Sequence, residues 1–263
     1  QAALVARWLG IGFIHGVMNT DNMSIAGETI DYGPCAFMDI YHPSTVYSSI
    51  DAQGRYAYAN QPQIAQWNLA RLTETLLPLL GDTEAAQLEA GKSAIMAFAG
   101  LFEDAYAGVL RSKLGLAQAR DGDLDLAHDL LDRMTRNAAD MTLTFRRLAD
   151  AAADPAADER VGELFQVPAA FTGWAERWRE RLGSEGGDPA ARREAMRCAN
   201  PAFIPRNHLV EEAIAAAVRR EDFVPFEALV AVLQHPYEDQ PGRDRYTLPP
   251  EPDEVVRQTF CGT

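Results

Sequence analysis

The chain has 263 residues, of which 47% are hydrophobic and 24% charged, and this composition excludes disordered and collagen-like proteins. Acidic residues outnumber basic ones by 38 to 24, which gives a formal net charge of -14. This balance argues against a nucleic-acid-binding protein, because affinity for the phosphate backbone needs clustered Lys and Arg.

The first segment carries an amphipathic pattern. Leu4, Trp8 and Ile11 recur at helical spacing within "QAALVARWLGIGFIHG", so we expect a helix there. Because Gln1 already lies in or beside this helix, we expect the chain to be the later part of a longer protein.

A polar turn follows in "HGVMNTDNMSIAGETIDYG". The segments "NTDNMSI" and "GETIDYG" are expected to form two short strands around a turn near Gly27. This hairpin would bring Asp21, Asn22 and Asp31 close together. Carboxylates that share a site repel one another unless a cation or a proton is shared between them.

A long irregular stretch, "MDIYHPSTVYSSIDAQGRYAYANQP", comes next, and from Gln61 onward the pattern is helical. Breaks at "LLGDT", "ARDGD", "ADPAADE", "SEGGDPA" and "NPAFIPRN" indicate about six helices, with no internal repeat and no clear domain boundary. Trp67, Trp174 and Trp178 are expected in the core. No run of about 20 apolar residues is present, so we expect no membrane-spanning segment.

Two further patterns have ordinary structural interpretations. The run "DGDLD", residues 121–125, imitates the start of a calcium loop, but Leu126 stands where a sharp turn needs Gly. We therefore expect a helix N-terminus there. Arg206 and Asn207 follow Pro205 at a helix start, where they can cap the helix or contact the irregular stretch.

The cysteines Cys35, Cys198 and Cys261 are widely spaced. They form neither a CxxC metal pair nor a disulfide framework, which fits a reducing compartment. The expected location is the cytoplasm.

The polar turn follows the order of a protein-kinase C-lobe, in which H-R-D-x-x-x-x-N and D-F-G supply the metal ligands. His15 begins the run and is expected to support the loop. Asn22 occupies the eighth position and Asp31 opens D-Y-G, so their oxygens can converge on a divalent cation. Val17 replaces the catalytic Asp and cannot accept a proton, which leaves Asp21 as the nearest carboxylate. The alternative is that Asp21 and Asn22 are ordinary turn formers.

The chain strongly resembles the selenoprotein O family of protein adenylyltransferases through "HGVMNTDNMSIAGETIDYGPCAFMD", "SSIDAQGRYAYANQP" and "NPAFIPRNHLVEEAI". The resemblance implies transfer of AMP from ATP, with Mg²⁺ or Mn²⁺, to Ser, Thr or Tyr hydroxyls of protein substrates. Carried over by position, Asp21 is the base and Asn22 and Asp31 are the metal ligands.

The fold that this resemblance implies is mainly α. A kinase-like C-lobe spans residues 1–263, with the catalytic loop, a short β-hairpin at the metal site, the DYG motif and an activation-type loop in 1–60 and a helical region in 61–263. The family's N-lobe, which grips the nucleotide, is expected to be absent, so this chain by itself is expected to be inactive. Its partners are expected to be hydroxyl-bearing proteins and its own missing N-lobe, with neither nucleic acid nor membrane.

The carboxyl end adds to the resemblance, since Cys261 stands where animal members carry selenocysteine. Some bacterial members are thought to pair this cysteine with one in the activation-type loop, and Cys35 is the only nearby candidate here. Three functions remain open: an adenylyltransferase, a phosphotransferase using the same metal pair, and a nucleotide-binding scaffold without chemistry. Val17 counts against the second, and an intact Asn22 and Asp31 count against the third.

Overall fold

The computed structural model describes residues 1–260 and is mainly helical, as predicted. The strands are β1 (Phe13–Ile14) and β2 (Ala36–Phe37). The α-helices are α1 (Ala2–Gly10), α2 (Gln61–Leu76), α3 (Glu84–Leu114), α4 (Asp123–Arg136), α5 (Met141–Ala153), α6 (Asp158–Gly162), α7 (Pro168–Gly183), α8 (Pro189–Ala199), α9 (Asn207–Arg220) and α10 (Val224–Leu233).

The described residues after 60 contain nine α-helices, so the expected number of six is wrong. Two of the additional breaks, between α4 and α5 and between α9 and α10, contain a residue with left-handed backbone that is not glycine. These residues are Ala138 (φ 49°) and Glu221 (φ 53°). Since neither residue type favours that conformation, the sequence carries no local signal for these breaks.

The expected hairpin is reduced to one antiparallel bridge, between Met23 and Thr29. Residues 20–22 form a 3-10 turn, and Gly27 (φ 74°) closes the tip with its N–H bonded to the carbonyl of Ser24. The two strands predicted here are therefore wrong, although the chain does reverse at the predicted place. A turn of 3-10 helix cannot continue a strand ladder, which is why pairing stops after one bridge.

The described chain divides into two compact units, where the sequence indicated no boundary. The first holds residues 1–35, 43–108 and 258–260, and the second holds 36–42 and 109–257. The division falls inside α3, and because the helix is continuous there, the composition of the sequence does not change at the boundary. Each unit is described separately below.

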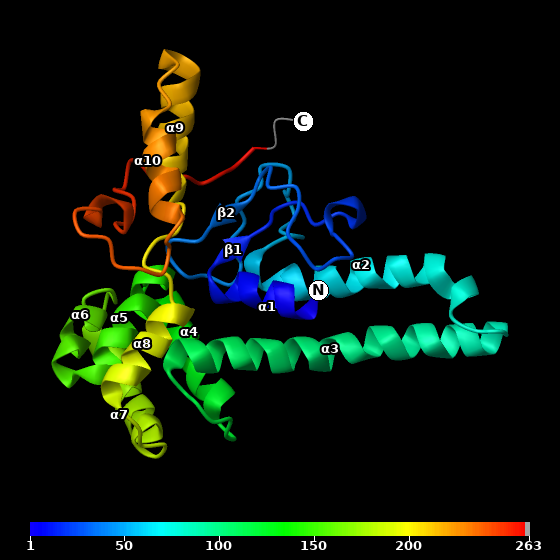
Figure 1. Ribbon diagram of the computed structural model, residues 1–263, viewed down its shortest axis with the longest axis horizontal. Helices are drawn as coiled ribbons and strands as arrows, with labels where there is room; N and C mark the ends of the chain where they lie inside the picture. The colour runs from blue at the N-terminus through cyan, green and yellow to red at the C-terminus, as the bar shows by residue number, and fades with distance from the viewer. Residues whose placement is uncertain (261–263) are drawn as a thin grey trace. The chain divides into compact units, whose positions relative to one another are not determined.

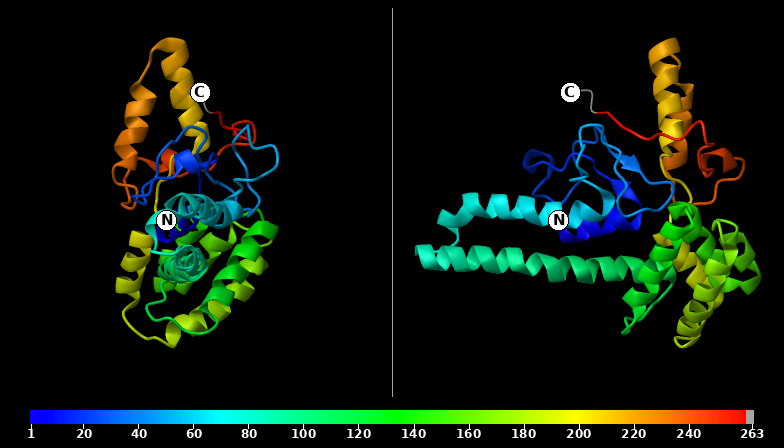
Figure 2. Two further views of the ribbon diagram at one scale, coloured as in Figure 1. Left: turned by 90° about the vertical axis from the view of Figure 1, so that its right-hand side faces the viewer. Right: turned by 180° about the vertical axis from the view of Figure 1, so that it is seen from behind.

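In the first unit, α1 packs against α2, and residues 84–108 of α3 run antiparallel beside α2 (Figures 1 and 2). Gly91 makes the close approach possible, since a Cβ there would lie 2.9 Å from the Thr73 side chain. Gln66 on α2 donates to the carbonyl of Ile95 on α3, at 3.2 Å. This pair of helices forms the support under the polar turn.

Helix α3 bears on the expectation that no segment spans a membrane, and that expectation stays a prediction. Its 31 residues include an 18-residue window with mean hydropathy 1.3, of which 17% is buried, so length and composition alone would allow it to cross a membrane. The core helices of soluble proteins pass the same test, and a single such helix therefore decides little.

In the second unit, α4 to α8 pack together (Figure 1), and α7 contributes two tryptophans to the core. Trp174 and Trp178 are fully buried and stack with their ring centroids 5.4 Å apart. Their indole N–H groups donate to the carbonyls of Leu126 and Leu114, at 2.8 and 2.9 Å. The prediction that both are core residues is confirmed, and a buried indole that keeps its hydrogen bond pays no desolvation penalty.

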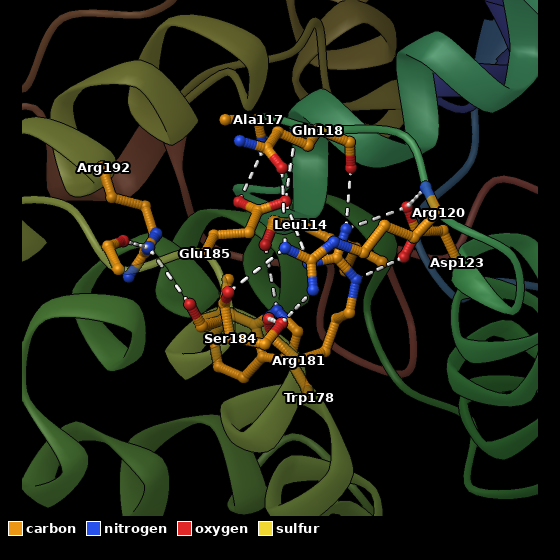
Figure 3. A network of polar contacts seen from close by, with 12 residues as sticks. Leu114, Ala117, Gln118, Arg120, Asp123, Trp178, Arg181, Ser184, Glu185 and Arg192 are labelled. Atoms are coloured by element: carbon orange, nitrogen blue, oxygen red, sulfur yellow. Dashed lines mark hydrogen bonds and ion pairs between the residues drawn. The ribbon is translucent and has the colours of Figure 1, made fainter.

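The run "DGDLD" begins helix α4, as expected. Gly122 (φ 87°) precedes the helix, and the buried Asp123 accepts from the backbone N–H of Arg120. Figure 3 shows Arg181 of α7 between Asp123 and Glu185, with nitrogen to oxygen distances of 2.6 and 2.9 Å. Because Asp123 is committed to this ion-pair network, the segment is structural.

Arg206 and Asn207 contact the segment that follows the DYG turn. Buried Arg206 lies 2.7 Å from Asp39 and 2.6 Å from Asp140, and Asn207 bonds both backbone groups of Phe37. Neither side chain caps α9. The capping interpretation is therefore wrong, and contact with the irregular stretch, to which Asp39 belongs, is confirmed.

Candidate functional site

The site is built on the backbone between β1 and the 3-10 turn, and this backbone is held by one buried amide. Gln61, the first residue of α2, accepts from the N–H of His15 at 3.0 Å and donates to the carbonyl of Phe13 at 2.9 Å. Gln61 and His15 are both fully buried. A single side chain thus satisfies two backbone groups that would otherwise be buried without a partner.

The ring of His15 joins the two halves of the site. Its Nε2 lies 2.8 Å from the carbonyl of Ile30, and its Nδ1 accepts from the N–H of Val17 at 3.4 Å. A carbonyl can only accept, so the proton is on Nε2. Burial lowers the pKa of His15, although the Ile30 carbonyl and the Asp31 carboxylate oppose that shift. His15 is therefore neutral at physiological pH and supports the loop through hydrogen bonds, as predicted.

Asn22 is oriented by the same loop. Its Nδ2 donates to the carbonyl of Val17 at 2.9 Å, and its backbone N–H donates to the carbonyl of Asn19. The amide is fixed by the first bond, and within residues 1–260 no hydrogen bond reaches its Oδ1. This oxygen is available as a ligand.

Asp21 and Asp31 are both exposed, on the two arms of the turn. Asp31 has a left-handed backbone (φ 55°), which is uncommon for a residue other than glycine. Its Oδ1 accepts a long bond, 3.4 Å, from the N–H of Gly33. Such strained conformations occur at functional sites more often than elsewhere, because the surrounding structure must enforce them.

The bridge between Met23 and Thr29 sets the register of these arms. Asn22 directly precedes Met23 and Asp31 lies two residues after Thr29, so the bridge holds together the two arms that carry them. The bond from His15 to Ile30 holds the same end of the turn. Two independent contacts thus bring the backbones that carry Asn22 and Asp31 to one place.

Two more side chains hold the loop and a third holds the end of α1 before it, and sequence reasoning missed all of them together with Gln61. Tyr56 donates to Oδ1 of Asn19 at 2.6 Å, Tyr58 donates to the carbonyl of Leu9 at 2.6 Å, and Asn68 donates to the carbonyl of Met18 at 3.0 Å. All three are buried. Their signal was faint: polar residues on the buried side of α2 and of the segment before it.

Gly16 shows how tightly the loop is packed. It has φ 82°, and a Cβ there would lie 2.9 Å from the carbonyl oxygen of Pro34. The backbone that follows the DYG turn therefore passes directly against the loop after His15. Any other residue would be strained by both conformation and space.

The oxygen donors fit a hard divalent cation. Asn22 offers an amide oxygen and Asp31 a carboxylate, and Mg²⁺ takes such ligands with phosphate oxygens and waters in its remaining positions. In residues 1–260, no three His, Cys, Asp or Glu side chains gather as a metal cage, so a cation here would need oxygens from a ligand as well. Val17 is buried with both backbone groups engaged, which agrees with its lack of a proton-accepting role.

A groove of about 760 Å³ opens beside the turn in the first unit. Its walls are mostly apolar. The residues that line it are Gln1, Ala2, Ala3, Thr20, Met23, Ser24, Ile25, Asn68, Leu69, Arg71, Leu72, Thr75, Ala94, Phe98 and Leu101. Thr20 and Met23 flank Asp21 and Asn22, so the groove borders the candidate site directly.

Cys35 is poorly suited to redox chemistry. Burial raises the pKa of its thiol to about 11, so little thiolate forms at neutral pH. Cys198 is exposed, and Cys261 lies outside the described residues. The pairing considered for Cys35 and Cys261 stays a prediction, and the raised pKa counts against it.

Comparison with known proteins places this geometry in context. The family model described as "Protein adenylyltransferase SelO" matches residues 1–234. "Protein nucleotidyltransferase YdiU" of Methylorubrum extorquens (strain PA1) is 62% identical over 269 residues, covering 100% of this chain and 54% of that protein. Proteins of the same name from Rhodopseudomonas palustris (strain BisB18) and Rhizobium rhizogenes (strain K84 / ATCC BAA-868) are 59% and 57% identical over 263 residues, covering 100% of this chain and 53% and 52% of those proteins.

The chain thus spans about half the length of the curated relatives that it matches. The expectation that it corresponds to their later half stays a prediction, as do the roles of Asp21, Asn22 and Asp31. The matched region contains the complete polar turn, the irregular stretch and α2.

Proposed function

Because this chain belongs to the SelO family, we propose that it forms part of a protein adenylyltransferase that transfers AMP from ATP to Ser, Thr or Tyr hydroxyls of proteins. Its fold in this proposal is a kinase-like C-lobe. One observation supports the proposal most. The bond from His15 to Ile30 joins the loop that carries Asp21 and Asn22 to the turn that carries Asp31.

In this proposal Asn22 and Asp31 hold Mg²⁺ or Mn²⁺, which would neutralise phosphate charge when bound. Asp21 accepts the proton of the attacking hydroxyl. A bond forms between that hydroxyl oxygen and the α-phosphorus of ATP, the bond from this phosphorus to the bridging oxygen breaks, and pyrophosphate leaves. The exposure of Asp21 suits this role, because a protein substrate must reach it from solvent.

Val17 disfavours a conventional kinase reaction, since a buried valine stands in place of the catalytic Asp. A scaffold without chemistry is disfavoured by Asn22, whose amide is oriented so that its oxygen stays available. We also propose that this chain alone is inactive. If only one side of the nucleotide is bound, its phosphates are not held in place, and this positioning is most of what nucleotidyl transfer requires.

The test is the intact mass of the full-length protein after incubation with ATP and Mg²⁺ or Mn²⁺. We expect a gain of one AMP on itself or on an offered protein, with loss of the gain in Asp21→Ala and Asp31→Ala. Asp121→Ala is the matched control, because it removes an exposed carboxylate in the loop before α4. A gain of phosphate would support the kinase alternative, and no gain on any protein would favour the scaffold.

A further inference from the structure

Trp67 does not lie in the core, where it was expected. It lies on α2 and is 44% exposed. The guanidinium groups of Arg55 and Arg71 lie over its indole, at 4.9 and 5.2 Å from the ring centroid. Such distances are those of cation–π contacts, which hold a flexible arginine in a defined place at little cost.

These two cations are incompletely neutralised. Within residues 1–260, Arg55 makes no ion pair, and only its backbone N–H is bonded, to Asp51. Arg71 pairs with Glu74 at 2.7 Å, but both side chains are about half exposed, so the pair is weak. The chain as a whole has a net charge of -14. A shared ring therefore holds two positive charges together on an otherwise acidic protein.

The same residues border the candidate site. Arg55 also lies over the ring of Tyr56, at 5.8 Å, and Tyr56 donates to Asn19, which directly precedes the 3-10 turn carrying Asp21. Arg71 lines the groove that Thr20 lines. Arg55 and Arg71 thus connect with the polar turn by two routes, one through the irregular stretch and one through α2.

We propose that Arg55, Trp67 and Arg71 form a docking surface for acidic residues of the protein substrate. Carboxylates suit the two guanidinium groups, and the exposed indole offers an apolar face to the stems of Glu side chains. Nucleic acid is a poorer match, because two cations release few counterions and the rest of the chain is acidic. This surface rests on the proposed function, for which it would hold the substrate while its hydroxyl lies beside Asp21.

The test is binding of a fluorescent peptide to the full-length protein, measured by anisotropy without ATP. One peptide carries a single Tyr flanked by Glu, and a second has Gln in place of each Glu. We expect the Glu peptide to bind more tightly at low salt, with a dissociation constant that rises about tenfold in the double variant Arg55→Glu, Arg71→Glu. Trp67→Ala should weaken binding about threefold, since the guanidinium groups lose the ring that holds them.

Arg220→Glu is the matched control, because it reverses an exposed charge at the end of α9. Equal binding of the two peptides would overturn the proposal, and so would an equal loss in Arg220→Glu. The anisotropy does not depend on catalysis, so the proposed function can fail in the mass measurement while this surface stands. Where AMP transfer is found, the Arg variants should raise the KM for the Glu peptide and leave the KM for ATP unchanged.

Discussion

The buried ion-pair cluster around Arg206 allows a quantitative prediction. Arg206 is 1% exposed, and its guanidinium binds Asp39 at 2.7 Å, Asp140 at 2.6 Å and the carbonyl of Thr247 at 2.9 Å. Arg206→Leu keeps much of the side-chain volume but leaves two carboxylates in the interior without their counter-charge. The variant therefore removes the counter-charge and the bond to Thr247 with little loss of packing volume.

Removing one partner of a buried ion pair costs about 3 to 5 kcal/mol, because the remaining charge stays desolvated. We expect the free energy of unfolding to fall by about that amount. Domains are usually stable by only about 5 to 15 kcal/mol, so the loss is a large share. Adding Asp39→Asn and Asp140→Asn should recover a large part, since a neutral amide leaves no buried charge, and Asn at 140 can still cap α5.

The loss should also depend on pH. Burial raises the pKa of Asp39, and Arg206 is the first force that opposes this rise. Without Arg206 the folded-state pKa of Asp39 should move further above its value in the unfolded chain. The folded variant then binds a proton more readily than the unfolded one. Its deficit is therefore full above the folded pKa and shrinks as the pH falls through it.

Urea unfolding followed by tryptophan fluorescence at several pH values from 7 to 4 measures this deficit. Arg136→Ala is the control, because its pair with Asp132 is highly exposed and should contribute less than about 1 kcal/mol. A loss below about 1 kcal/mol in Arg206→Leu, constant over this pH range, would refute the reasoning.

Three other changes test separate parts of the structure. Gln61→Leu should lower the free energy of unfolding, measured in urea, by about 2 to 4 kcal/mol, because the buried N–H of His15 and the carbonyl of Phe13 lose their hydrogen-bond partner. Gln63→Leu, on the exposed side of α2, should leave the free energy of unfolding unchanged. Thiol labelling of the native protein at pH 8, mapped by peptide mass, should modify exposed Cys198 well before Cys35, whose pKa is raised to about 11; equal rates would contradict the burial of Cys35. Burial lowers the pKa of Lys113 to about 7, so between pH 7 and 10 the unfolded chain binds a proton that the folded chain does not. The stability advantage of Lys113→Met over the parent should therefore be largest below pH 7 and should shrink toward pH 10. A difference in thermal midpoint that does not change with pH would contradict this.

The sequence by itself determined much of the local structure. Helical spacing located α1 and the long helices, and the Asp, Gly and Pro signals marked five of the breaks, because caps and left-handed turns act within a few residues. The order of His15, Asn22 and Asp31 predicted a joined polar turn. It could do so because a bond between His15 and Ile30 and a bridge between Met23 and Thr29 span few residues.

Only the tertiary structure decided what holds that turn and where side chains face. Gln61, Tyr56 and Asn68 reach the loop from segments 37 to 50 positions away in the chain, a relation that no local pattern encodes. Trp67 was expected in the core, but α2 packs on α1 and leaves this indole half exposed. Local chemistry fixes where the backbone turns, whereas burial is settled by which surfaces meet, and that depends on contacts distant in sequence.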